Sequence, residues 1–202
     1  MATTRSSKSK SKRSRKPARR TSVKPSPDAV ALLKADHREV SGWFAKFESS
    51  RSSRRKQELA GKICKALRVH TQIEEEIFYP AFLAATRDKD MHHEAAVEHD
   101  GAKQLIAQLE ASGPNDDYYD AKVKVLSEMI RHHVNEEEQR GGMFAEARQS
   151  SMDLKALGEQ LKARKDELMA GGAGGTPRGR RGTIGRLFNG SRRPAAAATG
   201  IR

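Results

Sequence analysis

The chain has 202 residues and a formal net charge of +13, but this charge is unevenly distributed. Residues 1–27 contain ten Lys or Arg and residues 171–202 contain seven Arg, with no acidic residue in either segment. Residues 28–170 carry 22 basic and 26 acidic residues, so their own net charge is −4. Segments so basic and so poor in large apolar residues cannot bury enough apolar surface to fold. We therefore expect disordered basic tails at 1–26 and 171–202, around one domain of ordinary size.

The composition also excludes several classes of protein. A single cysteine, Cys64, excludes an intrachain disulfide framework and a metal site built from several cysteines. No apolar run approaches the roughly 20 residues of a membrane-spanning helix, and no apolar segment follows the basic start as it does in a secretory signal. We therefore expect a cytoplasmic protein with no membrane partner, which its tails could associate with the nucleoid. A monomer is favoured over an oligomer.

Apolar residues three and four positions apart predict the first two helices. The first helix is expected to begin with Ser26 as its N-cap and Pro27 at its first position, and to end in the polar run 49–53. The second helix is expected over about 56–85. Pro80 lies inside this range and removes one backbone hydrogen bond, so it is expected to kink the helix.

The same spacing predicts three further helices. The third contains Met91 and ends at the turn residues 112–115. The fourth is expected over about 116–149, with a weak point at Gly141-Gly142. A shorter fifth helix is expected within 150–170.

These elements together favour an all-α protein. The sequence has no alternating apolar pattern of the kind typical of β-strands. Four long amphipathic helices joined by short connections predict an up-down-up-down four-helix bundle over 27–149. The short fifth C-terminal helix, within 150–170, is expected to pack on the bundle and to cover one end of it.

Polar side chains of the kinds that bind metals lie on the apolar faces of these helices. Residues four apart lie on one face of a helix, so His70 and Glu74 point the same way, as do His133 and Glu137. Each such group is costly to bury unless it is paired. One further histidine lies on the apolar face of the first helix and another on that of the third, so all six could meet at one level. The six predicted ligands are His37, His70, Glu74, His99, His133 and Glu137.

Four imidazoles and two carboxylates suit a first-row transition ion: iron in the first place, with manganese or zinc as alternatives. Two ions are more natural than one, with two histidines for each ion and the glutamates bridging. Six protein ligands leave open positions on two such ions for water, dioxygen or a similar small ligand. The alternative is that each histidine is an ordinary hydrogen-bonded core residue. Four of them buried without partners would be too costly for that interpretation to be preferred.

The register of the fourth helix has an alternative, because His132 and Glu136 have the same spacing as His133 and Glu137. The apolar stripe that includes Ile130 favours His133.

Other polar and apolar residues near the predicted site are assigned lesser roles. His92 and His93 are expected to be capping or surface residues, and Cys64 a packed, inert thiol. The pocket is expected to be lined or kept dry by Phe44, Ile77, Phe78, Ile130 and Phe144.

Four segments carry a family resemblance: Asp36-His37, His70 to Pro80, Glu98-His99 and His132 to Glu138. In these segments the chain resembles the hemerythrin-like, HHE cation-binding family, over about 28–149. The resemblance implies a non-haem di-iron site that binds dioxygen, nitric oxide or peroxide, or senses iron or redox state. The pattern is closer to bacterial members with four His and two Glu, some of which act in stress repair of iron centres. Oxygen-carrying hemerythrins have a fifth histidine where this chain has Ala95.

Three hypotheses for function follow. The favoured one is a di-iron protein that binds or senses a small diatomic or peroxide ligand. The first alternative is an enzyme that uses the same site, on peroxide or in stress repair. The second is a nucleic-acid-associated iron-binding protein, because acid-free basic segments bind phosphate backbones non-specifically. The tails could equally be solubilising or docking segments. The candidate nucleic-acid contacts are Lys12, Arg13, Arg15, Lys16, Arg19, Arg20, Arg180 and Arg181.

Overall fold

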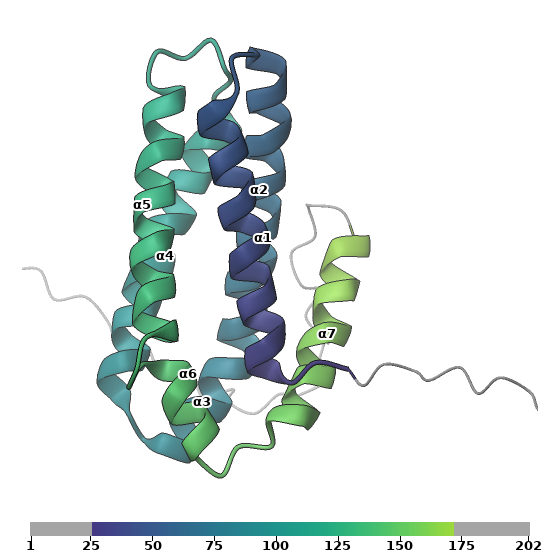
Figure 1. The fold of residues 1–202 in the computed structure, drawn as a ribbon, viewed down its shortest axis with the longest axis vertical. Coiled ribbons are helices and arrows are strands. Elements are labelled where there is room, and N and C mark those ends of the chain that lie inside the picture. The colour runs from purple at the N-terminus through teal and green to yellow at the C-terminus, as the bar shows by residue number, and fades with distance from the viewer. Residues whose placement is uncertain (1–25, 172–202) are drawn as a thin grey trace, which may run out of the picture.

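The computed structural model describes residues 26–171, so the two tails and their candidate nucleic-acid contacts lie outside the described residues. Four long helices stand side by side in the described part (Figure 1), which contains no strand. They are α1 (Ala29–Ser49), α2 (Ser53–Ile73), α4 (Lys89–Ala111) and α5 (Tyr119–Glu138). Each helix packs against its two neighbours in the cyclic order α1, α2, α4, α5. The predicted all-α bundle is confirmed.

The first helix begins two residues later than the sequence suggested. Asp28, not Ser26, is the N-cap, and its Oδ1 accepts a hydrogen bond of 2.8 Å from the backbone N–H of Ala31. A carboxylate at this position satisfies a free backbone donor and complements the positive end of the helix dipole.

The predicted second helix is divided by a π-helical turn. α2 is followed by η1 (Glu74–Phe78), which leads into α3 (Tyr79–Thr86). Pro80 has no N–H, and in an α-helix its ring would collide with the carbonyl four residues earlier. The wider turn relieves this conflict, and the N–H of Tyr79 donates to the carbonyl of Glu74, five residues back. The effect of the proline is therefore a wide turn before it, placed next to the polar layer of the bundle.

The predicted fourth helix ends earlier than expected. α5 stops at Glu138, and a separate short helix, α6 (Met143–Gln149), follows a turn at 139–142. Gly141 has φ = 83°, in the left-handed region that favours glycine. A Cβ on Gly142 would lie 2.2 Å from the carbonyl oxygen of Glu136, so this backbone approach also requires glycine. The Gly-Gly pair thus breaks the helix completely.

The C-terminal helix α7 (Leu154–Ala170) does not cover an end of the bundle as expected. It lies along one side of the lower half in Figure 1, against α1, α2 and η1. Leu161 of α7 is fully buried, and Gly158 allows close contact with the chain at 27–29. The turn after α6 reverses the chain direction, which brings α7 back beside α1.

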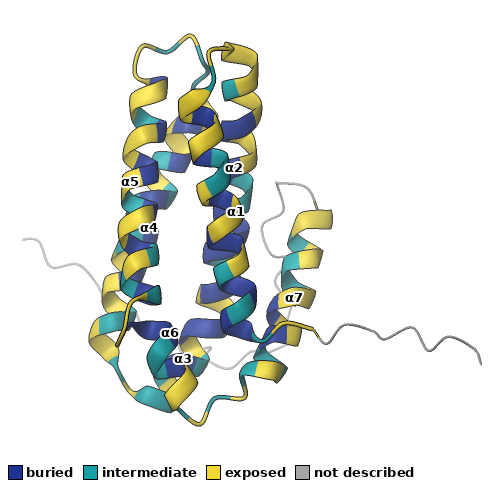
Figure 2. Ribbon diagram, in the orientation of Figure 1, coloured by how far each residue is buried: buried dark blue, intermediate teal, exposed yellow. Residues whose placement is uncertain are grey.

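The core is divided into two apolar clusters by a polar layer (Figure 2 shows the buried inward faces). On α1 and α2, the histidines of this layer lie between a residue of one cluster and a residue of the other. His37 lies between Leu33 and Val40, and His70 is flanked in the same way along α2. Cys64 belongs to the first cluster, and burial raises the pKa of its thiol to about 11, as expected for an inert side chain. None of the described helices is long and apolar enough to cross a membrane.

Candidate metal centre

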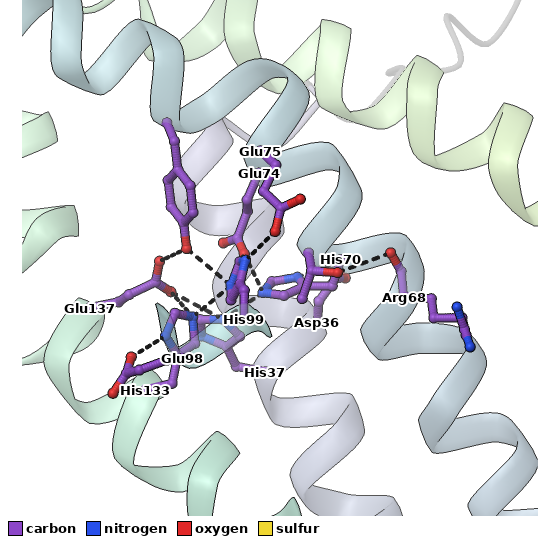
Figure 3. Close-up of polar contacts among 12 residues, drawn as sticks. Asp36, His37, Arg68, His70, Glu74, Glu75, Glu98, His99, His133 and Glu137 are labelled. Atoms are coloured by element: carbon purple, nitrogen blue, oxygen red, sulfur yellow. Dashed lines mark hydrogen bonds and ion pairs between the residues drawn. The ribbon is translucent and has the colours of Figure 1, made fainter. Parts of the chain in front are cut away.

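The six predicted ligands meet at one level of the bundle (Figure 3), and none is more than 5% exposed. They come from α1, α2, the first residue of η1, α4 and α5. The histidines form two pairs with their Nε2 atoms facing each other. Nε2 of His37 lies 3.0 Å from Nε2 of His70, and the corresponding distance between His99 and His133 is 3.2 Å. The structure thus brings together all six predicted ligands, which the sequence analysis placed on the inward faces of the helices.

The two glutamates lie between the histidine pairs. Oε2 of Glu74 is 3.2 Å from Nε2 of His70 and 3.4 Å from Nε2 of His99, so this carboxylate reaches one histidine of each pair. Oε2 of Glu137 lies 3.5 and 3.7 Å from the Nε2 atoms of the other two histidines. Each carboxylate therefore lies between one histidine of the first pair and one histidine of the second.

An outer set of carboxylates faces the Nδ1 atoms of the histidines. Asp36 Oδ2 lies 3.6 Å from Nδ1 of His70, and Glu98 Oε2 lies 2.8 Å from Nδ1 of His133. Both carboxylates directly precede a histidine of the centre in the sequence and reach the next helix. A carboxylate at this position fixes the orientation of a metal-binding imidazole and raises its basicity.

Two further carboxylates complete this outer set. Glu75 Oε1 lies 3.0 Å from Nδ1 of His99, and Glu138 Oε1 lies 2.8 Å from Nδ1 of His37. Each directly follows a glutamate of the centre in the sequence. Each histidine of the centre therefore faces a carboxylate from the preceding element of the bundle: α1 for His70, η1 for His99, α4 for His133 and α5 for His37. The sequence analysis assigned a role in the site to none of the four; Glu75 and Glu138 lie in glutamate runs, which are usually solvated.

The protonation pattern of this layer favours cations at its centre. The hydrogen bond from His99 lowers the pKa of Glu75, so its carboxylate accepts and Nδ1 of the imidazole carries the proton. Nε2 of a neutral imidazole then presents a lone pair. Two such nitrogens about 3 Å apart repel each other unless an electrophile lies near both. Burial also lowers the pKa of His37, with the neighbouring His70 and His133 adding to the effect, so this histidine is neutral.

The buried glutamates give the same indication. Both oxygens of Glu74 and Oε2 of Glu137 are buried and have no hydrogen-bond partner. Burial raises the pKa of Glu74 to about 7 and that of Glu137 to about 8. The nearby charge of Glu74 raises the pKa of Glu137 further. Buried carboxylates without partners are costly, whereas oxygens grouped with imidazole nitrogens are ordinary ligands for transition ions. The donor set therefore fits a bound metal ion, and its donor atoms form two candidate groups of ligands that share Glu74.

Tyr79 is a residue of the site that the sequence analysis missed. Its O–H donates to Oε1 of Glu137 at 3.2 Å and lies 3.1 Å from Nε2 of His99. Burial raises its pKa well above 10, so the phenol stays protonated. Tyr79 follows the π-turn directly, and a regular helical repeat would not place it on this face. Its only signal in the sequence is its position directly before Pro80.

We expect Tyr79→Phe to retain the fold and the metal but to weaken metal binding about tenfold, the usual lower range for the loss of a partner of a ligand. The reason is that Oε1 of Glu137 would lose its donor. Titration with cobalt(II) measures the change, with Tyr118→Phe, on an exposed residue, as the control. Unchanged affinity would show that the phenol does not support the ligand.

The predicted pocket residues separate into two groups. Phe144 stacks on His37 with 5.8 Å between ring centroids, and Phe78 packs edge-on against Phe144 at 5.7 Å. Ile130 lines a cavity of about 10 Å³ bounded by the four histidines, which is about the space of one water molecule. Phe44 lies in the apolar cluster that contains Val40 and Cys64 and does not line this cavity. Ile77 is half-buried against the other cluster, which contains Leu33 and Phe78.

The remaining histidines differ in exposure. The side chain of His132 is 62% exposed while that of its neighbour His133 is 5% exposed, so His133 is the inward residue. His93 is exposed, as expected. His92 is half-buried and packs edge-on against Tyr79 with 5.9 Å between ring centroids, so the expected capping or surface role is wrong for this residue. Asp88 is the N-cap of α4.

The four-helix bundle and its buried cluster of histidines and glutamates place the chain in the class of helical metal-binding proteins. The chain belongs to the Hemerythrin HHE cation binding domain family, whose model matches residues 28–141. The chain is similar to a crystal structure of a Hemerythrin HHE cation binding domain-containing protein, an Rv2633c homolog from Mycobacterium kansasii. That likeness has a TM-score of 0.61 and 23% identity over 72% of this chain and 89% of the other.

The chain is also similar to a protein named DNA nickase from Nostoc sp. (strain PCC 7120 / SAG 25.82 / UTEX 2576). The two are 28% identical over 139 residues, which are 68% of this chain. The match covers 39% of the length of that relative.

Proposed function

We propose that the chain is a non-haem di-iron protein that binds or senses dioxygen, nitric oxide or peroxide. One observation carries the proposal: two pairs of facing imidazole nitrogens have buried carboxylate oxygens without hydrogen-bond partners between them. Family membership supports a cation at this position.

Each residue of the centre has a defined part in this proposal. His37 and His70 would hold one ion and His99 and His133 the other. Glu74 belongs to both groups of ligands, and Glu137 belongs to the first group and reaches His133 at 3.7 Å. Two iron ions would supply a redox couple and open positions for a small ligand, and manganese or zinc would fit the same donors. The outer carboxylates hold the imidazoles in orientation.

The surroundings of the centre favour a small ligand. The cavity against the histidines has a volume of about 10 Å³. The rings of Phe144 and Phe78, which belong to the apolar cluster that contains Leu33, help to close the polar layer on that side. The cavity against the histidines would admit only a molecule of a few atoms, and a second cavity of about 50 Å³, lined by His133 and Glu137 among others, also borders the centre. The Tyr79 phenol offers one hydrogen-bond donor beside Glu137. We therefore prefer a binder or sensor of such molecules to an enzyme acting on a larger substrate.

The test compares ligand binding with turnover. Iron-loaded protein is exposed separately to dioxygen, nitric oxide and hydrogen peroxide while its absorption spectrum and the peroxide concentration are recorded. The proposal predicts a spectral change with at least one ligand and peroxide loss no faster than with His133→Ala protein. Rapid, iron-dependent loss of peroxide would instead establish the enzyme alternative. No spectral change with any ligand, together with no loss of peroxide, would contradict both.

A second candidate function, association with nucleic acid, is favoured by the charge of the tails. Seventeen basic and no acidic residues lie in 1–27 and 171–202, and contacts to phosphates give strongly salt-dependent binding. The relative named DNA nickase agrees with a link to DNA, although the match spans 39% of it. Retention on duplex DNA at low salt, lost when both tails are deleted, would support this function. Retention unchanged by the deletion would contradict it.

A further inference from the structure

Helix α7 lies outside the residues matched by the family model, 28–141, yet it contacts one of the four outer carboxylates of the metal centre, Asp36. Nζ of Lys165 pairs with Oδ1 of Asp36, and the other oxygen of this carboxylate faces the buried Nδ1 of His70 at 3.6 Å, an ion-pair distance longer than a hydrogen bond. The side chain of Asp36 is 11% exposed and that of Lys165 is 28% exposed, so the ion pair is largely shielded. A chain of contacts therefore leads from α7 to a predicted metal ligand.

The position of α7 is held at several points. The absence of a side chain at Gly158 allows α7 to approach the backbone at 27–29, where an added Cβ would lie 2.5 Å from the Pro27 carbonyl oxygen. Nε of Arg164 lies 2.7 Å from Oε2 of Glu76 on η1, and Nζ of Lys65 donates to the carbonyl of Met169 at 3.2 Å. With Leu161 buried, these contacts place Lys165 opposite Asp36.

The other three outer carboxylates also have a cationic or basic partner on their outer side. Glu138 lies 3.1 Å from Lys34, Glu75 lies 2.6 Å from Lys103, and Glu98 lies 3.2 Å from His132. Those three partners belong to the four long helices of the bundle. The fourth, Lys165, comes from the additional helix, so the shell around the centre is completed by α7.

We propose that Lys165 is a positioning residue for the metal centre, which holds Asp36 against His70 and so controls retention of the ion at the His37–His70 pair. This inference rests on the proposed function. A carboxylate fixed beside Nδ1 orients a ligating imidazole and raises its basicity. With Lys165 bound to Oδ1, Oδ2 stays directed at the imidazole. Without it, the carboxylate is free to rotate away toward water.

The test is the release of iron(II), without oxygen, from loaded full-length protein to a chromogenic ferrous chelator. For Lys165→Met we expect one of two irons to leave about tenfold faster, the lower range for an outer partner of a metal ligand, and the other to leave at the wild-type rate. Lys162→Met is the matched control, because Lys162 lies on the same helix but pairs with Asp166 on α7. Lys165→Arg keeps the charge and should restore slow release.

A double-substitution experiment separates positioning from a general effect on the fold. In the Asp36→Asn background, Lys165→Met should cause no further acceleration, because its effect passes through that carboxylate. Gly158→Leu, which prevents close docking of α7, should reproduce the faster release. Equal rates for Lys165→Met and Lys162→Met, or an undiminished effect of Lys165→Met beside Asp36→Asn, would overturn the inference. If wild-type protein bound no metal, the proposed function itself would fail, which is a distinguishable result.

Discussion

Glu74→Leu is expected to abolish binding of both metal ions while making the metal-free protein more stable. Glu74 contributes to both groups of candidate ligands, so its loss affects both ions. In the absence of metal the same carboxylate is fully buried, and neither oxygen has a hydrogen-bond partner. Replacing such a group with an apolar side chain of similar size removes a desolvation cost of about 1–3 kcal/mol.

Elemental analysis and urea unfolding in the presence of a chelator measure these two effects. Glu39→Leu, on the exposed face of α1, is the control and should retain the metal without a gain in stability. Retention of two metal ions by Glu74→Leu would mean that this carboxylate is not a shared ligand. A large loss of stability in the metal-free protein would mean that it has a structural role.

His133→Ala is expected to lose at least one of the two metal ions, and His132→Ala to retain both. The two residues are adjacent on α5, but the side chain of His133 is 5% exposed and faces the centre, whereas that of His132 is 62% exposed. Nε2 of His133 lies 3.2 Å from Nε2 of His99, so its removal dismantles one histidine pair.

Iron content after anaerobic loading measures this difference between neighbouring substitutions. His132 contacts Glu98 at 3.2 Å, so its replacement should at most weaken metal binding through that carboxylate. Equal losses of iron from the two variants would contradict the inward register of α5.

The helices and the inner residues of the site could be predicted from the sequence because both depend on a regular repeat. Apolar positions three and four apart identify the buried face of a helix, and polar residues on that face are conspicuous. His70 and Glu74 stood out for this reason. The predicted level at which the histidines meet follows from their positions near the middle of each helix, and the structure places them together there.

The parts that could not be predicted depend on departures from the regular repeat. The π-turn before Pro80 rotates Tyr79 into the site, and a helical projection would place it elsewhere. Glu75 looked like part of a solvated run, although it reaches across to the histidine of the next helix. The sequence did hold one usable signal: each outer carboxylate is the immediate neighbour of a residue of the centre.

The position of α7 depends on tertiary contacts that the sequence does not display. Its leucines predict an amphipathic helix but do not identify the surface that it covers. The docking depends on the close approach at Gly158 and on ion pairs from Arg164 and Lys165 to bundle residues more than 80 positions away in the chain.

The metal content of protein purified without oxygen tests the central claim most directly. Elemental analysis is combined with absorption spectra recorded before and after admission of air. The two-ion centre predicts about two irons per chain, a spectral change in air, and loss of metal when both His70 and His133 are replaced with alanine. A metal-free protein, or metal that remains after both replacements, would contradict the account.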